Sequence, residues 1–178
     1  AEPFIAARQL PAQAPIFAVP ESSSDFEPGD RAEARARTGV HGDPAILWIG
    51  RLDANKDPLT AIEAFRLASE RLPGAELWCV HGSDALLPAL ERRLASDPAL
   101  ASHVHLLGRV PHMQVEQLCR ACDLLLATSH REGSGYALIE ALACGLPSVV
   151  SDIAPFRALV GDLADSRFAA PGDASAFA

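Results

Sequence analysis

Two basic residues, Arg51 and Lys56, stand five positions apart between a buried apolar run and the expected start of a helix. The apolar run ends at Gly50, and Asp57, followed by proline, suits a helix N-cap and first helical position. Arginine holds a phosphate through two parallel hydrogen bonds, lysine adds a mobile charge, and helix N–H groups attract anions. The pattern predicts an anion site, although two solvated cations, one paired with Asp53 or Asp57, would fit it equally.

A second cluster runs from Glu132 to Glu140, after another apolar run, and holds Gly133 and Gly135 in its first part. The glycines let a backbone approach a ligand closely, and a helix expected from Tyr136 would direct its N–H groups to the same place. Carboxylates accept hydrogen bonds from hydroxyl groups, so the two glutamates would flank the anion site and bind sugar rings. A nucleoside diphosphate sugar has this layout. A glycine-rich turn with two surface glutamates is the structural alternative, but Glu140 lies within an apolar helix, where an unpaired charge is costly.

Other familiar chemistry is disfavoured. The first strand is not followed by G-x-G-x-x-G, which disfavours nicotinamide binding, and there is no G-x-x-x-x-G-K-[ST] loop. Two glutamates eight positions apart allow a glycosidase, but the glycines and the cation pair favour a nucleotide. His103 and His105 alternate on an expected strand without an evident third ligand, so no metal site is predicted. Three histidines after strands are candidate ligand contacts: His81, His112 and His130.

The cysteines and the overall charge narrow the class of protein. Cys119 and Cys122 form a C-x-x-C without a second pair, so we expect structural thiols in a reducing compartment, with Cys79 and Cys144 in the core. A net charge of −8 without a basic stripe excludes nucleic acid as the main partner and favours a cytoplasmic location. The apolar runs are too short to span a membrane, and no signal peptide is visible. Because the first residue is not Met, we expect a piece of a larger protein.

Strands and helices alternate from residue 45 onward, which is typical of α/β folds: a Rossmann-like parallel sheet with helices on both faces. Ligands of such sheets bind beyond the carboxyl ends of the strands, where both clusters lie. The proline-rich segment 1–44 is expected to be an interdomain linker and edge segment, and 45–178 the nucleotide-sugar-binding domain. Expected strands cover 16–19, 45–49, 76–80, 104–107, 124–127, 148–150 and 168–169, and expected helices cover 31–38, 58–72, 85–94, 114–121 and 136–144.

In this order the motifs resemble those of a known family. They are Gly50-Arg51-Leu52 with Lys56, then the two glutamates as E-x7-E, then the stretch 141–147 before a strand. They are similar to those of retaining GT-B glycosyltransferases of family 4, also called group 1, over residues 16–172. The resemblance implies the C-terminal, donor-binding half of a GT-B fold. It also implies an enzyme that needs no metal and transfers a hexose from a nucleoside diphosphate sugar to a carbohydrate or lipid-linked acceptor.

The resemblance also implies roles for particular residues. Arg51 and Lys56 would hold the diphosphate and stabilise it as leaving group, and Glu132 would bind the donor sugar. The remaining contacts would be Glu140 to the ribose, the backbone N–H groups of Gly135, Tyr136 and Ala137 to the phosphates, and the turn of Arg109, Val110 and Pro111 to the base.

Two positions depart from the family pattern. Ser134 stands where an aromatic residue is frequent, and Asp57 where glycine often follows the lysine. The resemblance also implies an N-terminal domain outside this chain, which would bind the acceptor and provide any membrane attachment. We therefore expect weak donor binding and little or no sugar transfer by the isolated chain. A non-catalytic nucleotide-sugar-binding module, a GT-B epimerase and, more remotely, a dehydrogenase are the alternatives.

Overall fold

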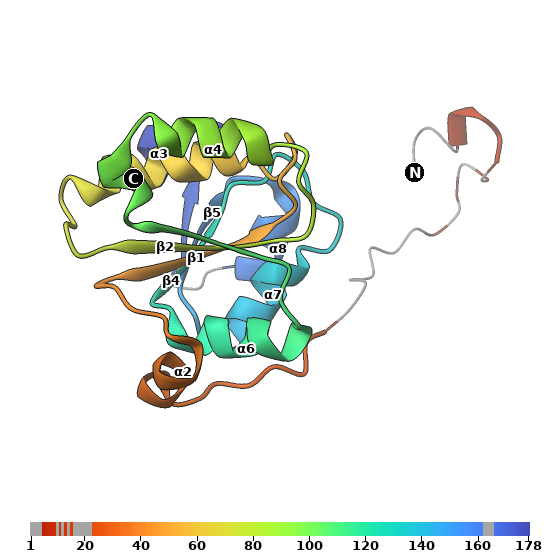
Figure 1. Ribbon diagram of the computed structural model, residues 1–178. Coiled ribbons are helices and arrows are strands. Elements are labelled where there is room, and N and C mark those ends of the chain that lie inside the picture. Colours follow the sequence, from red (N-terminus) through yellow and green to blue (C-terminus); the bar gives the residue numbers. More distant parts are fainter. Residues whose placement is uncertain (1–4, 10, 12, 14, 16–22, 162–165) are drawn as a thin grey trace.

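The computed structural model describes residues 5–9, 11, 13, 15, 23–161 and 166–178, and shows a parallel sheet between two layers of helices (Figure 1). Six strands pair in parallel in the order β3-β2-β1-β4-β5-β6, the order of dinucleotide-binding folds. The predicted α/β fold class is confirmed. The strands are β1 Ala45–Gly50, β2 Glu76–His81, β3 Val104–Gly108, β4 Leu124–Ala127, β5 Ser148–Ser151 and β6 Ser166–Ala169.

Helices α3 and α4 cover one face of the sheet, and α6, α7 and α8 cover the other (Figure 1). Three short helices, α5, α8 and α9, were not expected from the sequence, and α3 ends at Ser69 rather than at the later Pro73-Gly74. The helices are α2 Arg31–Thr38, α3 Pro58–Ser69, α4 Leu87–Ala95, α5 Pro98–Ala101, α6 His112–Ala121, α7 Tyr136–Ala143, α8 Ala154–Val160 and α9 Ala174–Phe177.

The two innermost strands, β1 and β4, are apolar throughout, as both faces of the sheet are covered. On the face of α6 and α7, Leu47 packs in one core cluster with Leu125 and Phe156. On the face of α3 and α4, Trp48 and Phe65 belong to a second cluster. Continuous apolar runs are the expected sequence of such doubly buried parallel strands, and the two cores hold rigid the strand ends from which the site loops leave.

Helix α2, predicted at Arg31–Thr38, packs against α6, and its charged side chains bind the chain between α6 and β4. Arg31 and Arg35 form ion pairs with Asp123 at 2.6 and 2.7 Å, and Arg35 Nε donates to the Ala121 carbonyl at 2.9 Å. The predicted strand at 16–19 lies outside the described residues. Across the described ranges, no helix combines the length and apolar character that a membrane span requires.

Candidate functional site

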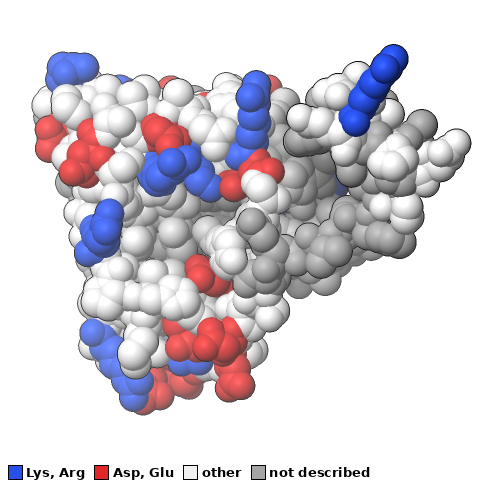
Figure 2. All heavy atoms as spheres, turned by 90° about the vertical axis from the view of Figure 1, so that its right-hand side faces the viewer, with Lys and Arg blue, Asp and Glu red and all other residues white. Residues whose placement is uncertain are grey.

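A pocket of about 500 Å³ opens at the carboxyl ends of β1 and β2, beside the N-terminus of α7. Figure 2 views the molecule from the side on which the strands end, and shows a hollow bordered by side chains of both charges. The volume is that of a small-molecule site. Its lining residues are Ile49, Gly50, Arg51, Lys56, Val80, Gly82, Glu132, Gly133, Ser134, Gly135, Tyr136, Ala137 and Glu140.

The loop after β1 is folded by its own aspartates. Asp53 Oδ1 accepts hydrogen bonds from the backbone N–H groups of Asn55 and Lys56, at 3.0 and 2.9 Å. Asp57 takes a left-handed backbone, with φ of 49°, and caps α3 by accepting from the Thr60 N–H at 3.1 Å. This fixes the backbone of Lys56 beside the pocket. The capping role predicted for Asp57 is therefore confirmed.

Both cations of the loop already have acidic partners. The Lys56 ammonium group forms an ion pair with Glu132, and only 20% and 11% of these two side chains are exposed. Arg51 is more open, with 64% of its side chain exposed, and its Nε lies 3.1 Å from Asp53 Oδ2. The pairing of a cation with Asp53, one of the alternatives left open by the sequence, therefore occurs. An anionic ligand would have to compete with Glu132 for Lys56.

The N-terminus of α7 points backbone donors into the pocket through a conformation that needs glycine. Gly135 has φ of 69°, and a Cβ there would lie 2.9 Å from Leu159 Cδ1. Because Gly135 carries no side chain to cap the helix, the first-turn N–H groups at Tyr136 and Ala137, which line the pocket, remain for a ligand. Of the two glycines that precede the helix, only Gly135 takes the left-handed conformation; Gly133 does not.

Glu140 is partnered by a histidine that the sequence did not connect to it. His112, the first residue of α6, donates from Nε2 to Glu140 Oε1 at 2.7 Å. This hydrogen bond raises the pKa of His112 above its ordinary value, against the opposing effect of burial. The Glu140 side chain is 13% exposed and the His112 side chain 66%. The buried carboxylate is thus compensated, and it still borders the pocket.

Arg109 and Val110, expected beside the base, are not among the described residues that line the pocket. Arg109 is nevertheless adjacent, since its Nη2 donates to the carbonyl of Gly82, a lining residue, at 2.8 Å. Val110 packs against the core on the α6 face. Contact of this turn with a base stays a prediction.

Of the other two histidines after strands, His130 has a structural hydrogen bond and His81 is buried. His130 Nε2 donates to the N-cap carboxylate of Asp57 at 2.9 Å. His81 is buried, and among the described residues its Nδ1 is the one buried side-chain nitrogen or oxygen without a hydrogen bond, with Asp84 Oδ1 at 3.5 Å. His81 lies in the chain between Val80 and Gly82 of the pocket lining but is not itself a lining residue, so its contact with a ligand stays a prediction.

His103 and His105 do have neighbours with ligand atoms, contrary to the expectation from the sequence. Both histidines donate to the carboxylate of Glu76, at 2.9 and 2.8 Å. Burial acts to raise the pKa of Glu76, but these bonds, from His105 and then His103, together lower it below its usual range. His41 is the third member of a group with Glu76 and His105 whose ligand atoms lie within 4.8 Å of one another.

The cysteines behave as core residues. All four are unpaired and buried, and burial raises the pKa of Cys79 and Cys122 to about 12. Cys119 and Cys144 are close enough to share a hydrogen bond. Within the described part of the chain, neither cysteine of the C-x-x-C belongs to a group of three candidate metal ligands. The surroundings of the four thiols therefore fit the prediction that they are structural core residues.

Comparison with protein families gives one decisive match. The model of the family "Glycosyl transferases group 1" matches residues 30–178, which is most of the chain. The chain belongs to the group 1 glycosyltransferases. It is similar to D-inositol 3-phosphate glycosyltransferases, with 34% identity over 141 residues to that of Mycobacteroides abscessus and 32% over 143 residues to that of Nocardia farcinica. Each alignment covers 77% of this chain, and the chain spans about a third of the length of these curated relatives.

Solved structures of glycosyltransferases share the fold of this group 1 chain. Sucrose-phosphate synthase from Thermosynechococcus elongatus superposes with a TM-score of 0.76 and 26% identity, over 98% of this chain and 44% of that one. The C-terminal domain of a group 1 protein from Francisella tularensis gives a TM-score of 0.73 at 19% identity, over 84% of this chain and 79% of that domain. The resemblance to the GT-B family is therefore confirmed. The shared fold does not identify the donor or the acceptor.

Proposed function

We propose that this chain is the donor-binding domain of a retaining glycosyltransferase that transfers a hexose from a nucleoside diphosphate sugar to a carbohydrate or lipid-linked acceptor. The observation that carries the proposal is the composition of one pocket. Arg51 and Lys56 come from one stretch of sequence and Glu132, Glu140 and the N-terminus of α7 from a second, about 75 positions later, and both stretches line the same cavity. Cations and helix N–H groups suit the diphosphate, and the carboxylates on either side suit the hydroxyl groups of two sugars.

The charges of the pocket suit the departure of a diphosphate. Breaking the bond between the sugar and the diphosphate leaves negative charge on a phosphate oxygen. Lys56, Arg51 and the N–H groups of α7 stabilise that charge in the transition state, because they are held in place before it develops. Glu132 orients the sugar through its hydroxyl groups, and Glu140 accepts from the ribose. Each of these steps uses only residues of this chain, and neither a metal nor a cofactor has a part in the proposal.

UDP-sugars are the first donors to test. A solved protein of similar fold, Anabaena HepE, was crystallised with UDP and glucose, and the chain superposes on it with a TM-score of 0.70 at 24% identity. The pneumococcal O-GlcNAc transferase GtfA, solved with UDP and GlcNAc, gives a TM-score of 0.69 at 22% identity. These matches support a sugar nucleotide as the class of donor, while the base has to be measured.

In this proposal the acceptor binds to a second domain of the transferase. The chain covers 44% of sucrose-phosphate synthase and about a third of its curated relatives, which leaves room for an N-terminal domain across the pocket. That domain would bind the acceptor and provide any membrane attachment. The isolated chain would then bind donor weakly and transfer little or no sugar. A net charge of −8 supports a cytoplasmic location for the chain.

Calorimetric titration with UDP-, GDP- and ADP-glucose, and with NAD, tests the proposal. Three proteins are compared: the wild type, Glu140→Ala, and the matched control Glu91→Ala on the exposed side of α4. We expect one sugar nucleotide to bind. Glu140→Ala should lose about 1.5 kcal/mol, roughly tenfold in affinity, as when a hydrogen bond to a charged group is removed, while the control should bind as the wild type does. Binding of NAD instead, or equal affinity in wild type and Glu140→Ala, would contradict the donor-site assignment.

A further inference from the structure

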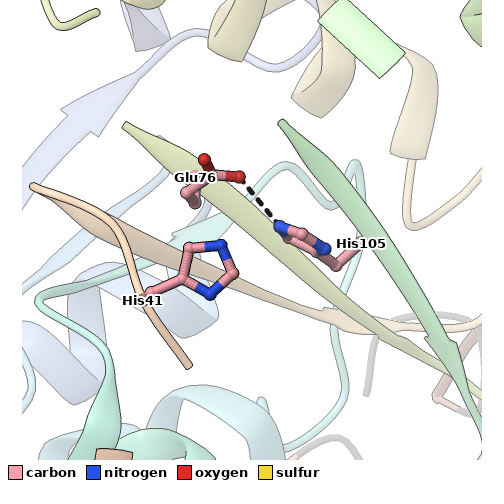
Figure 3. A group of neighbouring side chains, drawn as sticks. All are labelled: His41, Glu76 and His105. Carbon is pink, nitrogen blue, oxygen red and sulfur yellow. Dashed lines mark hydrogen bonds and ion pairs between the residues drawn. The ribbon is translucent and has the colours of Figure 1, made fainter. Parts of the chain in front are cut away.

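Three side chains converge at the opposite end of the sheet from the pocket, where β2 and β3 begin. Figure 3 shows His41, from the loop before β1, together with Glu76 of β2 and His105 of β3, all pointing into one space. One ligand atom of each residue lies within 4.8 Å of the others. Glu76 is buried, His105 is partly buried and His41 is exposed, so the cluster opens to solvent on the side of His41.

The sheet itself brings two of these residues together. Trp78 and His105 are register partners of the neighbouring strands β2 and β3, and their rings stack with centroids 3.9 Å apart. Glu76 lies two residues before Trp78 and therefore points to the same face of the sheet. Its carboxylate reaches the Nε2 atom of His105 at 2.8 Å and, with its second oxygen, the Nδ1 atom of His103 at 2.9 Å.

The loop that carries His41 lies close against this face because residue 42 is a glycine. Gly42 has φ of 122°, and a Cβ at that position would lie 2.8 Å from both Cβ and Cγ of Glu76. Trp78 Nε1 donates to the carbonyl of His41 at 3.0 Å, which holds the loop on the strand. The His41 ring meets the Trp78 ring edge-on with centroids 5.2 Å apart. The backbone of His41 is therefore held in place by contacts that do not depend on its imidazole.

The free ring nitrogen of His41 is suited to a metal. Its Nδ1 donates to the carbonyl of Gly39 at 3.1 Å, which leaves the lone pair of a neutral ring on Nε2. Metal-bound histidines commonly donate their second N–H to a backbone carbonyl in this way. On Glu76, the bond from His103 holds the second carboxylate oxygen and orients the first towards His105.

We propose that His41, Glu76 and His105 form a zinc site that fastens the loop before β1 to the β2–β3 edge. Two imidazoles and one carboxylate are a common ligand set for zinc, with water in the fourth position. Zinc would take the place of the Nε2 proton that His105 shares with Glu76, and this same proton would move to Nδ1 of the neutral ring. Ligand atoms of a tetrahedral zinc ion lie roughly 3.3 Å apart, so closure from 4.8 Å needs a movement of at most roughly 1.5 Å by the exposed ring of His41.

The site would hold the loop in place and would have no part in sugar transfer. It lies at the amino ends of the strands, whereas the candidate donor pocket lies at their carboxyl ends, so neither set of side chains contributes to the other. The zinc site does not rest on the proposed transferase function. Zinc binding should therefore leave the affinity for a sugar nucleotide unchanged and raise the thermal unfolding temperature of the chain.

Titration of the metal-free chain with Zn²⁺ by calorimetry tests the proposal. We expect one zinc per chain, and at least about tenfold weaker binding in His41→Ala, since loss of even an outer-shell residue of a metal site commonly has an effect of that size. Because His41 is exposed, this variant should keep the fold, which circular dichroism checks. The control His112→Gln removes an exposed histidine outside the cluster and should bind zinc as the wild type does. Absence of zinc binding, or equal affinity in His41→Ala, would overturn the proposal.

The fluorescence of Trp78 provides a second readout at the site itself. Co²⁺ takes zinc ligands and quenches nearby fluorophores. It should reduce the summed emission of Trp48 and Trp78 by a saturable part, because the indole of Trp78 touches both imidazoles. Excess Zn²⁺ should restore the emission. Glu76→Gln keeps the shape and removes the charge, and should abolish the saturable phase while the control His112→Gln retains it. Quenching that is unchanged in Glu76→Gln would place the metal elsewhere and overturn the assignment.

Discussion

Replacement of Glu132 by glutamine should change the preference of the pocket between a nucleoside diphosphate and its sugar conjugate. In the free chain Glu132 neutralises Lys56, and both side chains are largely buried. A diphosphate must therefore share Lys56 with a carboxylate that also repels it. Glu132→Gln removes the competitor and the repulsion together, but it also removes the proposed acceptor for the hydroxyl groups of the sugar.

Glu132→Gln should therefore strengthen the binding of UDP and weaken the binding of a UDP-sugar. An ion pair of this kind is worth about 1 kcal/mol, so UDP without sugar should bind roughly fivefold more tightly to Glu132→Gln. For a UDP-sugar, the lost hydrogen bond to a charged acceptor costs about 1.5–3 kcal/mol, which exceeds that gain. The sugar conjugate should then bind more weakly by about 0.5–2 kcal/mol. The ratio of the two dissociation constants should move by at least tenfold.

Calorimetric titration of both ligands into wild type, Glu132→Gln and Lys56→Met measures this ratio. Lys56→Met removes the cation itself and should weaken both ligands alike, by about 1–2 kcal/mol, which separates loss of attraction from relief of competition. Glu91→Gln on α4 is the matched surface control. If Glu132→Gln weakened UDP and the UDP-sugar equally, Glu132 would neither compete for Lys56 nor bind the sugar, and the reasoning would fail.

Three further predictions concern particular side chains. Gly135→Ala should destabilise the chain by about 1–3 kcal/mol in chemical denaturation, because its backbone is left-handed and its Cβ would collide with a side chain of α8; unchanged stability would contradict the described start of α7. The imidazole pKa of His112, followed by NMR, should lie above 6.5 and fall in Glu140→Gln. Because the folded pKa is the higher one, the pair stabilises the fold fully below pH 6.5 and loses its effect as the pH rises through the raised pKa; an unshifted pKa would exclude the hydrogen bond. Alkylation of the native chain should reach Cys144 first, since a hydrogen bond from another thiol lowers its pKa, whereas Cys79 should react only on unfolding; early labelling of Cys79 would contradict its burial.

Elements with strong local signals could be predicted from the sequence. Asp57 followed by proline marks the start of α3, and the apolar run of β4 was placed at its observed bounds. Helix α8 was missed because it has seven residues, too few to display a period, and its N-cap Ile153 offers no capping side chain. The four residues of α5 and of α9 are shorter still. Local patterning fails where an element is too short to carry it.

Contacts between distant side chains depend on the strand order, which local patterns do not contain. The residues around the two helix starts, including Lys56 and Glu132, could be assigned to one pocket because carboxyl ends of parallel strands meet at one edge. The partners of Glu140 and Glu76 could not be assigned, since His112 and His41 lie 28 and 35 positions away from them. Each glutamate lies beside its histidine because of the path that the loops take over the sheet.

The charge arrangement of the pocket has a consequence for donor selection. Lys56 and Arg51 are each paired before any ligand arrives, with Glu132 and Asp53 respectively. A bare phosphate gains little from these two cations, because each contact that it makes with Lys56 or Arg51 replaces an existing ion pair. A sugar nucleotide supplies the diphosphate and the sugar hydroxyl groups together, so it can take over the lysine and still satisfy the released glutamate. In the proposed donor site, selectivity for the complete donor would therefore arise from the pairing of Lys56 with Glu132, and it would require the carboxylate as much as the cation.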